Sequence, residues 1–256
     1  ERVKYLKMLD NTLTLTLPSG TTEDAWRMRG AYQCEVARNV VSWSIPAICD
    51  GGTHGTMLYH ALNNYFHDNY WLVKSNAPGR RYALHLRDST RFNTFARDTI
   101  IEDLSGSGSL GLVWTGSGNN STMLSLRSNT MRGCVVKVRS EGLSWSNYSR
   151  GDSIVGNVFI STGGNALACT QDVPPDSVVL EHNAFVSPTL NTFKGAARFE
   201  GLNYGVRGWS VRYNVFYNGR TSTSPPAYAS VVYLGQDNNS THALDDATTT
   251  DDYNLF

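Results

Sequence analysis

The sequence has little that would draw it to a membrane or to a highly charged partner. Among its 256 residues, 22 are Lys or Arg and 22 are Asp or Glu, so the formal net charge is zero. Without a net charge, the chain has no overall field that attracts nucleic acid or an anionic membrane. No apolar run approaches the length needed to span a bilayer. We therefore expect neither nucleic acid nor a membrane as a partner.

Cysteine is scarce as well. The four residues Cys34, Cys49, Cys134 and Cys169 lack the CxxC spacing of zinc and redox sites, so we expect no metal held by sulfur. Cys34 and Cys49 are near enough in sequence to close a short loop in an oxidising compartment. Cys134 and Cys169 are predicted to be buried free thiols.

Charged residues are also few, at 17% of the chain. Gly, Ser, Thr and Asn are common instead, which favours short strands joined by tight turns over amphipathic helices. The length is within the range of one large all-β domain. The composition thus predicts a single all-β domain.

One pattern recurs along most of the chain: an Asn followed two residues later by a large apolar residue, usually Phe. Copies start at Asn39, Asn64, Asn93, Asn129, Asn157, Asn183, Asn214 and Asn254. Successive copies are between 25 and 40 residues apart. Internal repetition at this scale predicts a solenoid in which loops of variable length join constant coils.

The repeat also predicts how the coils pack. Alternating apolar stretches, such as 134–139 and 153–156, lie before or between the Asn motifs, so each coil is expected to contribute at least two strands. Asn tolerates the left-handed backbone angles of a tight turn. If equivalent turns stack at the strand spacing, each Asn amide can donate a hydrogen bond to its neighbour and form a ladder. The Phe two places later is expected to stack in the core.

Segments such as 154–159 (Ile-Val-Gly-Asn-Val-Phe) and 211–216 (Val-Arg-Tyr-Asn-Val-Phe) resemble the coils of the right-handed parallel β-helix superfamily, which includes pectate-lyase-like polysaccharide lyases. The resemblance covers roughly residues 37–256. It implies an all-β, single-stranded right-handed parallel β-helix of roughly seven or eight coils. It does not indicate one function, because the superfamily also includes glycoside hydrolases, epimerases, phage tailspikes, adhesins and eukaryotic ectodomains.

Residues 1–36 depart from the repeat and are expected to form an N-terminal cap or opening coil, because an uncovered solenoid end exposes core and strand edges. Within them, residues 22–29 have acidic residues early and are interpreted as a short helix. The chain stops at Phe256 on a further copy of the repeat. This end predicts a truncated chain, or partners such as further copies or neighbouring domains at the solenoid ends.

Outward-facing residues of equivalent strands should form columns with neighbours about 4.8 Å apart. If strands at 82–87, 134–139, 165–170 and 196–200 are equivalent, one basic strip results. Its members are His85, Arg87, Lys137, Arg139, Arg198 and Glu200, with Glu141 just beyond. Such a strip fits a uronate-containing polysaccharide, because cations bind the carboxylates and a flat sheet follows the extended chain.

Cleavage of that polysaccharide by β-elimination needs a group that neutralises the uronate and a base that reaches the adjacent proton. Lys137 is the candidate base, Arg139 the candidate neutraliser or acid, and His85 the second choice of base. Lys137-Val138-Arg139 is similar to the neighbouring Lys and Arg that some polysaccharide lyases of this fold use.

The remaining members of the strip, Arg87, Glu141, Arg198 and Glu200, are candidate substrate-binding residues. Trp145, in a predicted exposed loop, is a candidate platform for a sugar ring. The alternative is a solvated sheet surface whose charges pair across strands and contribute little energy.

Other signals are weaker. His54 lies in a glycine-rich stretch similar to the Gly-His-Gly of pectin-degrading hydrolases, but the paired aspartates of that family are missing, so we reject it. No cofactor is expected. Calcium at the pairs Asp245–Asp246 and Asp251–Asp252 is an alternative, against which a solvated Thr-rich turn is the simpler interpretation.

Asn-x-Ser/Thr triplets occur in polar, turn-like stretches. They start at Asn119, Asn120, Asn147, Asn238 and Asn239. Chance would produce several in a chain so rich in Asn and Ser. The alternative is N-glycosylation, with Asn120, Asn147 and Asn239 as the candidate sites, in a secreted or surface-exposed protein.

Two functions follow with nearly equal weight. The first is an extracellular β-helix that binds an acidic polysaccharide and, if it is an enzyme, cleaves it as a lyase. The second is a noncatalytic structural or adhesive module of a surface filament, phage fibre or larger ectodomain. A fragment of a cell-surface receptor is a third alternative.

Overall fold

The computed structural model describes residues 3–20, 24–48, 55–78, 80–115, 126–146, 149–169, 176–188, 196–199, 208–219, 232–234 and 250–256. Every regular element in these ranges is a β-strand. Their neighbouring strands pair in parallel and form three long sheets and one short pair. No helix in these ranges has the length and apolarity to cross a bilayer.

Each coil of the chain contributes one strand to each long sheet. Sheet 1 consists, in spatial order, of β1 (Lys7–Leu9), β4 (Glu35–Ala37), β7 (Tyr65–His67), β10 (Thr94–Ala96), β14 (Thr130–Arg132), β18 (Ser153–Val155), β21 (Val179–Glu181), β24 (Ser210–Arg212) and β27 (Thr250–Asp252). Sheet 2 consists of β2 (Thr12–Thr16), β5 (Val40–Ile45), β8 (Tyr70–Ser75), β11 (Thr99–Glu102), β15 (Val135–Val138), β19 (Val158–Ser161), β22 (Ala184–Ser187) and β25 (Val215–Asn218).

Sheet 3 closes each coil. It consists of β3 (Trp26–Arg29), β6 (Thr56–Tyr59), β9 (Arg80–Arg87), β12 (Ser109–Thr115), β16 (Leu143–Ser146), β20 (Leu167–Cys169), β23 (Ala197–Phe199) and β26 (Val232–Leu234). The short pair is β13 (Leu126–Arg127) with β17 (Ser149–Arg150).

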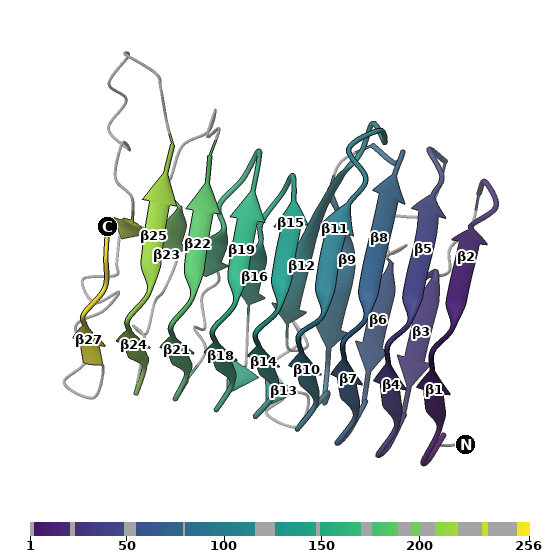
Figure 1. Cartoon of the computed structure of the whole chain (residues 1–256), viewed down its shortest axis with the longest axis horizontal. Helices are drawn as coiled ribbons and strands as arrows, with labels where there is room; N and C mark the ends of the chain where they lie inside the picture. Colours follow the sequence, from purple (N-terminus) through teal and green to yellow (C-terminus); the bar gives the residue numbers. More distant parts are fainter. Residues whose placement is uncertain are drawn as a thin grey trace.

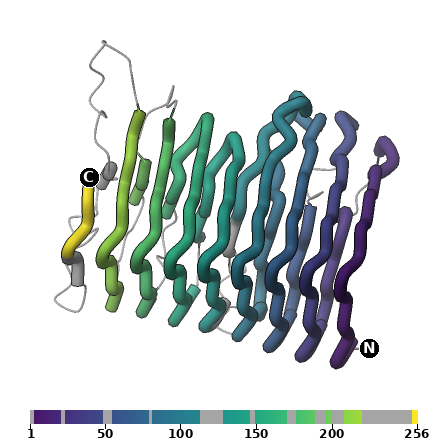
Figure 2. Tube along the Cα trace, viewed as in Figure 1, coloured from purple at the N-terminus to yellow at the C-terminus, as the bar shows by residue number. Residues whose placement is uncertain are grey.

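The result is a right-handed parallel β-solenoid, as the repeat predicts. Figures 1 and 2 show the coils stacked along one axis, with the two ends of the chain at opposite ends of the stack. In the described ranges, sheet 1 has nine strands and sheets 2 and 3 have eight each, so the count differs slightly from the expected seven or eight coils.

The N-terminal segment corrects one expectation. Residues 26–29, interpreted above as the end of a short helix, form strand β3, which pairs with β6 in sheet 3. Strands β1 and β2 likewise pair with β4 and β5. Register with the next coil therefore overrides the helix signal that the early acidic residues gave.

The core is filled by residues that alternate inward along the strands. The phenyl rings of Phe159, Phe185 and Phe216 stack in successive strands of sheet 2, with centroids 5.2 Å apart at each step. In sheet 1, Phe66 stacks on Phe95 at 4.8 Å. Parallel strands lie about 4.8 Å apart, so in-register pairing alone brings these rings into contact.

A ladder of side chains, buried except at its two ends, precedes sheet 2, and we call it the sheet-2 ladder. Its members are Asn11, Asn39, Asn69, Asp98, Cys134, Asn157, Asn183, Asn214 and Asn254. Nδ2 of Asn157 donates to Oδ1 of Asn183 at 3.0 Å, and Asn183 donates in the same way to Asn214 at 3.0 Å. The predicted amide ladder is thus confirmed.

A second ladder, the sheet-1 ladder, precedes sheet 1. Its members are Cys34, Asn64, Asn93, Asn129 and Asp152. The sequence pattern merged the two ladders into one: the step from Asn39 to Asn64 passes between ladders, whereas the true neighbour of Asn39 is Asn69, 30 residues away. This mixing explains part of the loose period.

The residue before each ladder position, not the Asn itself, makes the left-handed turn. Before sheet 2, φ is positive at Asp10, Arg38, Asp68, Arg97, Gly133, Gly156, His182, Tyr213 and Tyr253. One left-handed residue therefore turns the chain from sheet 1 into sheet 2. The Asn that follows directs its amide along the stack of coils. It therefore contributes hydrogen bonds between coils, and the left-handed backbone conformation belongs to the residue before it.

Candidate functional site

The predicted basic strip does not exist as one column. Lys137 lies on β15 in sheet 2, whereas His85 and Arg87 lie on β9 and Arg198 on β23, both in sheet 3. The error comes from treating β15 as equivalent to β9, whose true counterpart in that coil is β16. The strip thus divides between two faces of the solenoid.

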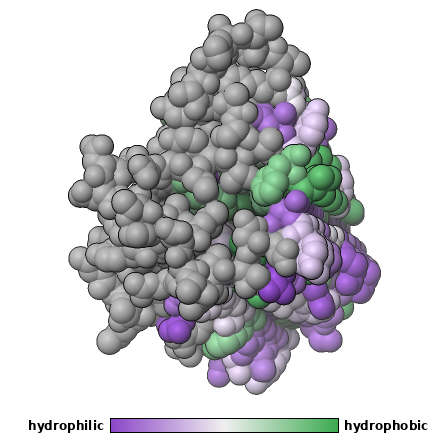
Figure 3. Space-filling view, turned by 90° about the vertical axis from the view of Figure 1, so that its left-hand side faces the viewer, coloured by the Kyte–Doolittle hydropathy of each residue, from purple (hydrophilic) through white to green (hydrophobic). Residues whose placement is uncertain are grey.

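Lys137 is an exposed cation in an otherwise apolar part of sheet 2. Its in-register neighbours on either side are Ile101 of β11 and Ile160 of β19. Val135, Val215 and Tyr217 on the same face are also exposed. Figure 3 shows the described surface from the C-terminal end, with a patch of hydrophobic residues between hydrophilic ones. The in-register neighbours of Lys137 are therefore aliphatic and offer no group that binds a uronate or moves a proton.

Arg139 is engaged with the scaffold. Its Nε donates to Oε1 of Glu102 at 2.5 Å, its backbone N–H donates to Oε2 at 2.6 Å, and Nη2 donates to the Gly106 carbonyl at 2.8 Å. The side chain of Glu102 is fully buried. Burial raises the pKa of Glu102, while the hydrogen bonds from Arg139 oppose that rise.

This geometry gives Arg139 a structural partner that the sequence did not indicate, and its predicted role in neutralising a uronate stays a prediction. A buried carboxylate needs a partner to offset the loss of hydration, and Arg139 is that partner for Glu102. Nothing in the sequence near 139 identifies Glu102, which is 37 residues away. Only the coil register brings them together.

His85 is also misplaced by the sequence pattern. It occupies an outward position of β9, in register with Met57 of β6 and Val113 of β12, yet it is only 6% exposed. The ring of Tyr82 is 5.2 Å from its imidazole. The expected exposed base on the polysaccharide strip is therefore wrong for His85.

The remaining candidates fall into three groups. Trp145 is a fully buried core residue of β16 whose indole contacts Trp209 at 5.6 Å, so it is not the exposed sugar platform predicted above. Glu141 is half-buried and accepts a hydrogen bond from Ser140 Oγ at 2.6 Å. Arg87 is exposed at the end of β9, and Arg198 is half-buried in β23.

Several predictions lie outside the described residues. They concern Cys49, His54, Asn119, Asn120, Asn147, Glu200, Asn238, Asn239, Asp245 and Asp246. Cys134 and Cys169 are buried and free, as expected, and burial raises the pKa of each thiol to about 12. Cys34 is also a buried free thiol within the described ranges.

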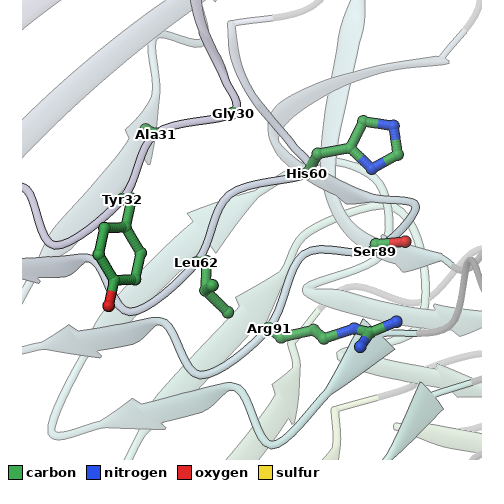
Figure 4. A pocket seen from close by; sticks show the side chains of 7 residues that line it. All are labelled: Gly30, Ala31, Tyr32, His60, Leu62, Ser89 and Arg91. Carbon is green, nitrogen blue, oxygen red and sulfur yellow. The ribbon is translucent and has the colours of Figure 1, made fainter. Parts of the chain in front are cut away.

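Sequence reasoning missed a pocket where sheet 3 turns into sheet 1. It has a volume of about 330 Å³ and is lined by Gly30, Ala31, Tyr32, His60, Leu62, Ser89 and Arg91, from three successive coils. Figure 4 shows the side chains of His60, Ser89 and Arg91 on one side of Leu62 and that of Tyr32 on the other. The pocket thus combines a cation, an imidazole, a hydroxyl and a phenol.

Two arginines and a tyrosine form a column beside this pocket, at the C-terminal ends of three strands of sheet 3. Arg29, Tyr59 and Arg87 are in-register neighbours on β3, β6 and β9. The guanidinium of Arg29 lies 5.2 Å from the centre of the Tyr59 ring, and the His60 ring lies 4.1 Å from the same ring in an edge-on arrangement. The next residue in each coil, Gly30, His60 and Asp88, has a positive φ.

Small residues recur at these turns. Gly30 stands where the next coil has His60, and Ala31 and Ala61 lie between the turn and the positions of Tyr32 and Leu62. The sequence does contain this signal, as Arg29-Gly30-Ala31-Tyr32 and Tyr59-His60-Ala61-Leu62, spaced 30 residues apart. It was overlooked because the Asn motif set the alignment of coils.

Comparison with known proteins adds little to this description. No family model and no curated protein matches the chain. Among solved structures, it is similar to QnrB1, described as a plasmid-mediated fluoroquinolone resistance protein, with 10% identity and a TM-score of 0.31 over 82% of this chain and 74% of that chain. A likeness this weak supports no conclusion, and the resemblance to pectate-lyase-like proteins is not confirmed beyond the solenoid fold.

Proposed function

We propose that this chain is a noncatalytic β-solenoid module that serves as a structural or adhesive support in an extracellular or surface-exposed protein. The observation that carries this proposal is the engagement of Arg139 by the buried carboxylate of Glu102. Arg139, the predicted neutralising group of a lyase site, thereby stabilises the fold instead.

The predicted lyase chemistry has no support from the arrangement of its three candidates. β-Elimination needs a neutralising group and a base that converge on one sugar ring. Arg139 is bound to Glu102, Lys137 projects from an apolar part of sheet 2, and His85 is buried in sheet 3. A substrate on one face cannot meet all three.

A support function fits what the polar residues do instead. The buried amides of the sheet-2 ladder bind one another along the stack, and exposed ion pairs follow the turn beside them. Arg38 binds Asp10, and Arg97 binds Asp68, each through two hydrogen bonds of 2.7–2.8 Å. A long, internally bonded rod is suited to hold partners at a fixed distance.

The proposal is tested with the intact chain and a panel of alginate, polygalacturonate and glycosaminoglycans. We expect no increase in the ultraviolet absorbance of unsaturated uronates. We also expect Arg139→Ala to lower the free energy of unfolding by about 3 kcal/mol, because it removes the guanidinium that pairs with the buried Glu102 carboxylate. Urea denaturation measures this change.

Lys137→Ala is the matched control, since it removes one cation from the same strand region. Its effect on stability should stay within about 0.5 kcal/mol, as for an exposed side chain. Production of unsaturated uronates by the wild-type chain, with loss of that activity in Lys137→Ala, would overturn the noncatalytic assignment.

A further inference from the structure

We propose that the pocket at the turn from sheet 3 to sheet 1, together with the adjoining column of Arg29, Tyr59 and Arg87, binds the acidic groups of an anionic polysaccharide. This proposal goes beyond the support function, because it assigns a ligand class and a site. The proposed glycan site lies at the turn from sheet 3 to sheet 1, whereas Lys137 lies on sheet 2.

The first support is the balance of charge. The three segments 29–32, 59–62 and 87–91 contain Arg29, Arg87 and Arg91 but one acidic residue, Asp88. Asp88 is 5% exposed at its side chain and lies 3.4 Å from Nε of Arg87, whose own side chain is 50% exposed. The Asp88 carboxylate therefore pairs with Arg87 from a buried position, while the Arg87 guanidinium remains accessible to a ligand.

The second support is the chemistry of the cations. Guanidinium groups bind carboxylates and sulfates with two parallel hydrogen bonds, and they do so better than ammonium groups. Within the described ranges, the exposed Arg29 contacts the ring of Tyr59 and no carboxylate. The aromatic ring orients Arg29 without neutralising its charge.

The third support is the repeat of these groups along the solenoid axis. Arg29 and Arg87 are two strand spacings apart, which corresponds to roughly 10 Å. A single small anion contacts one of them, whereas a polymer with acidic groups on successive sugars reaches both. The rings of Tyr32 and Tyr59 add apolar surface against which the faces of sugar rings can pack.

The pocket can enclose part of a sugar, whereas the column of Arg29, Tyr59 and Arg87 can contact a polymer only along the surface. His60 and Ser89 offer hydrogen-bonding groups beside Arg91 on one side of the opening (Figure 4). Sugar hydroxyls both donate and accept hydrogen bonds, so this mixture suits a sugar better than a simple inorganic ion. A residue seated here would present its acidic group to Arg91 and its neighbour to Arg29 or Arg87.

The test measures binding of the full chain to three immobilised polymers: polygalacturonate, dextran sulfate and uncharged dextran. We expect binding to at least one of the two acidic polymers and no binding to dextran. Whichever acidic polymer binds more tightly identifies carboxylate or sulfate as the preferred group. Arg29→Ala should weaken binding about tenfold, which corresponds to the loss of one charge-assisted interaction. Ser89→Tyr, which obstructs the pocket without changing charge, should weaken it by a similar factor.

Lys137→Ala serves as the charge-matched control and should change binding less than twofold. Arg87→Lys keeps the charge beside Asp88 but removes bidentate geometry, so intermediate weakening is expected. Thermal unfolding of each variant verifies that the fold is retained. Three results would each overturn the proposal: no binding to either acidic polymer, equal weakening by Lys137→Ala and Arg29→Ala, or full binding by Ser89→Tyr. All are independent of the absorbance assay for cleavage.

Discussion

The two ladders differ in how far the hydrogen-bonded Asn residues continue along the solenoid. In the sheet-2 ladder, Asn157, Asn183, Asn214 and Asn254 form an unbroken series of amides in the C-terminal half. In the sheet-1 ladder the amides stop at Asn129. After Asp152, the equivalent positions are Val178 and Trp209, which are buried apolar residues.

In each described coil from Asn39 to Asn214 at least one of the two ladder positions holds an Asn, so one buried amide per coil is sufficient for the fold. Where the sheet-2 ladder is interrupted by Cys134, the same coil has Asn129 in the sheet-1 ladder. Where the sheet-1 ladder becomes apolar, the sheet-2 ladder is continuous. A buried amide is favourable when each of its groups has a partner, and an apolar side chain is the alternative when it does not.

The largest effect is expected from an interruption of the continuous series. Asn183 donates to Ile154 and Asn214 and accepts from the backbone and side chain of Asn157. Asn183→Ala leaves those partners buried and unsatisfied, so the free energy of unfolding should fall by about 3 kcal/mol. Chemical denaturation measures the change.

Asn11→Ala provides the comparison within the same ladder. Asn11 is half-buried at the first coil, where it donates to Asn39 and to the Leu9 carbonyl. Water can replace these bonds, so the expected loss is about 1 kcal/mol. Equal losses for the two variants would contradict the view that buried continuity gives the ladder its stability.

An effect of opposite sign, smaller than that of Asn183→Ala, is expected at Asp98, the ionisable member of the sheet-2 ladder. Oδ1 of Asp98 accepts two bonds from Asn69, while no described residue hydrogen-bonds its buried Oδ2. Burial raises the pKa of Asp98 from 3.8 to about 7. The folded state therefore binds the proton more tightly than the unfolded state, and this contribution to stability falls as the pH rises from about 4 to 7.

Asp98→Asn retains an acceptor for Asn69 and removes the ionisable group. At pH 8 we expect the variant to be more stable than the wild type by about 2 kcal/mol, and at pH 4 the two should differ little. Unfolding curves recorded between pH 4 and pH 8 test this. A variant that is less stable at pH 8 would show that the carboxylate is favourable where it lies.

The fold was predictable because its determinants are local and repeated. Asn157-Val158-Phe159 and its copies carry both the ladder residue and the core ring in three consecutive positions. The second ladder was hidden because its members, such as Asn64 and Asn93, have the same motif. Cys134 and Asp98 were not recognised as ladder positions because they interrupt the Asn pattern.

The candidate site was not predictable from the same pattern. Assignment of Lys137 to the wrong sheet followed from loops of unequal length, which shift the apparent equivalence of strands. Glu102 meets Arg139, and Arg29 meets Tyr59, only after the coils are aligned. Contacts between coils depend on register, and register depends on every intervening loop.

Disulfide cross-linking between adjacent coils measures the register most directly. Ile160 of β19 and Val186 of β22 are paired, outward-facing neighbours, and Tyr217 of β25 is one strand further. The double variant I160C/V186C should form a disulfide readily under mild oxidation, because neighbouring strands bring the two Cα atoms to about 5 Å. I160C/Y217C, at twice that spacing, should remain reduced. Cross-linking of the second pair in preference to the first would contradict the stacked register on which both ladders depend.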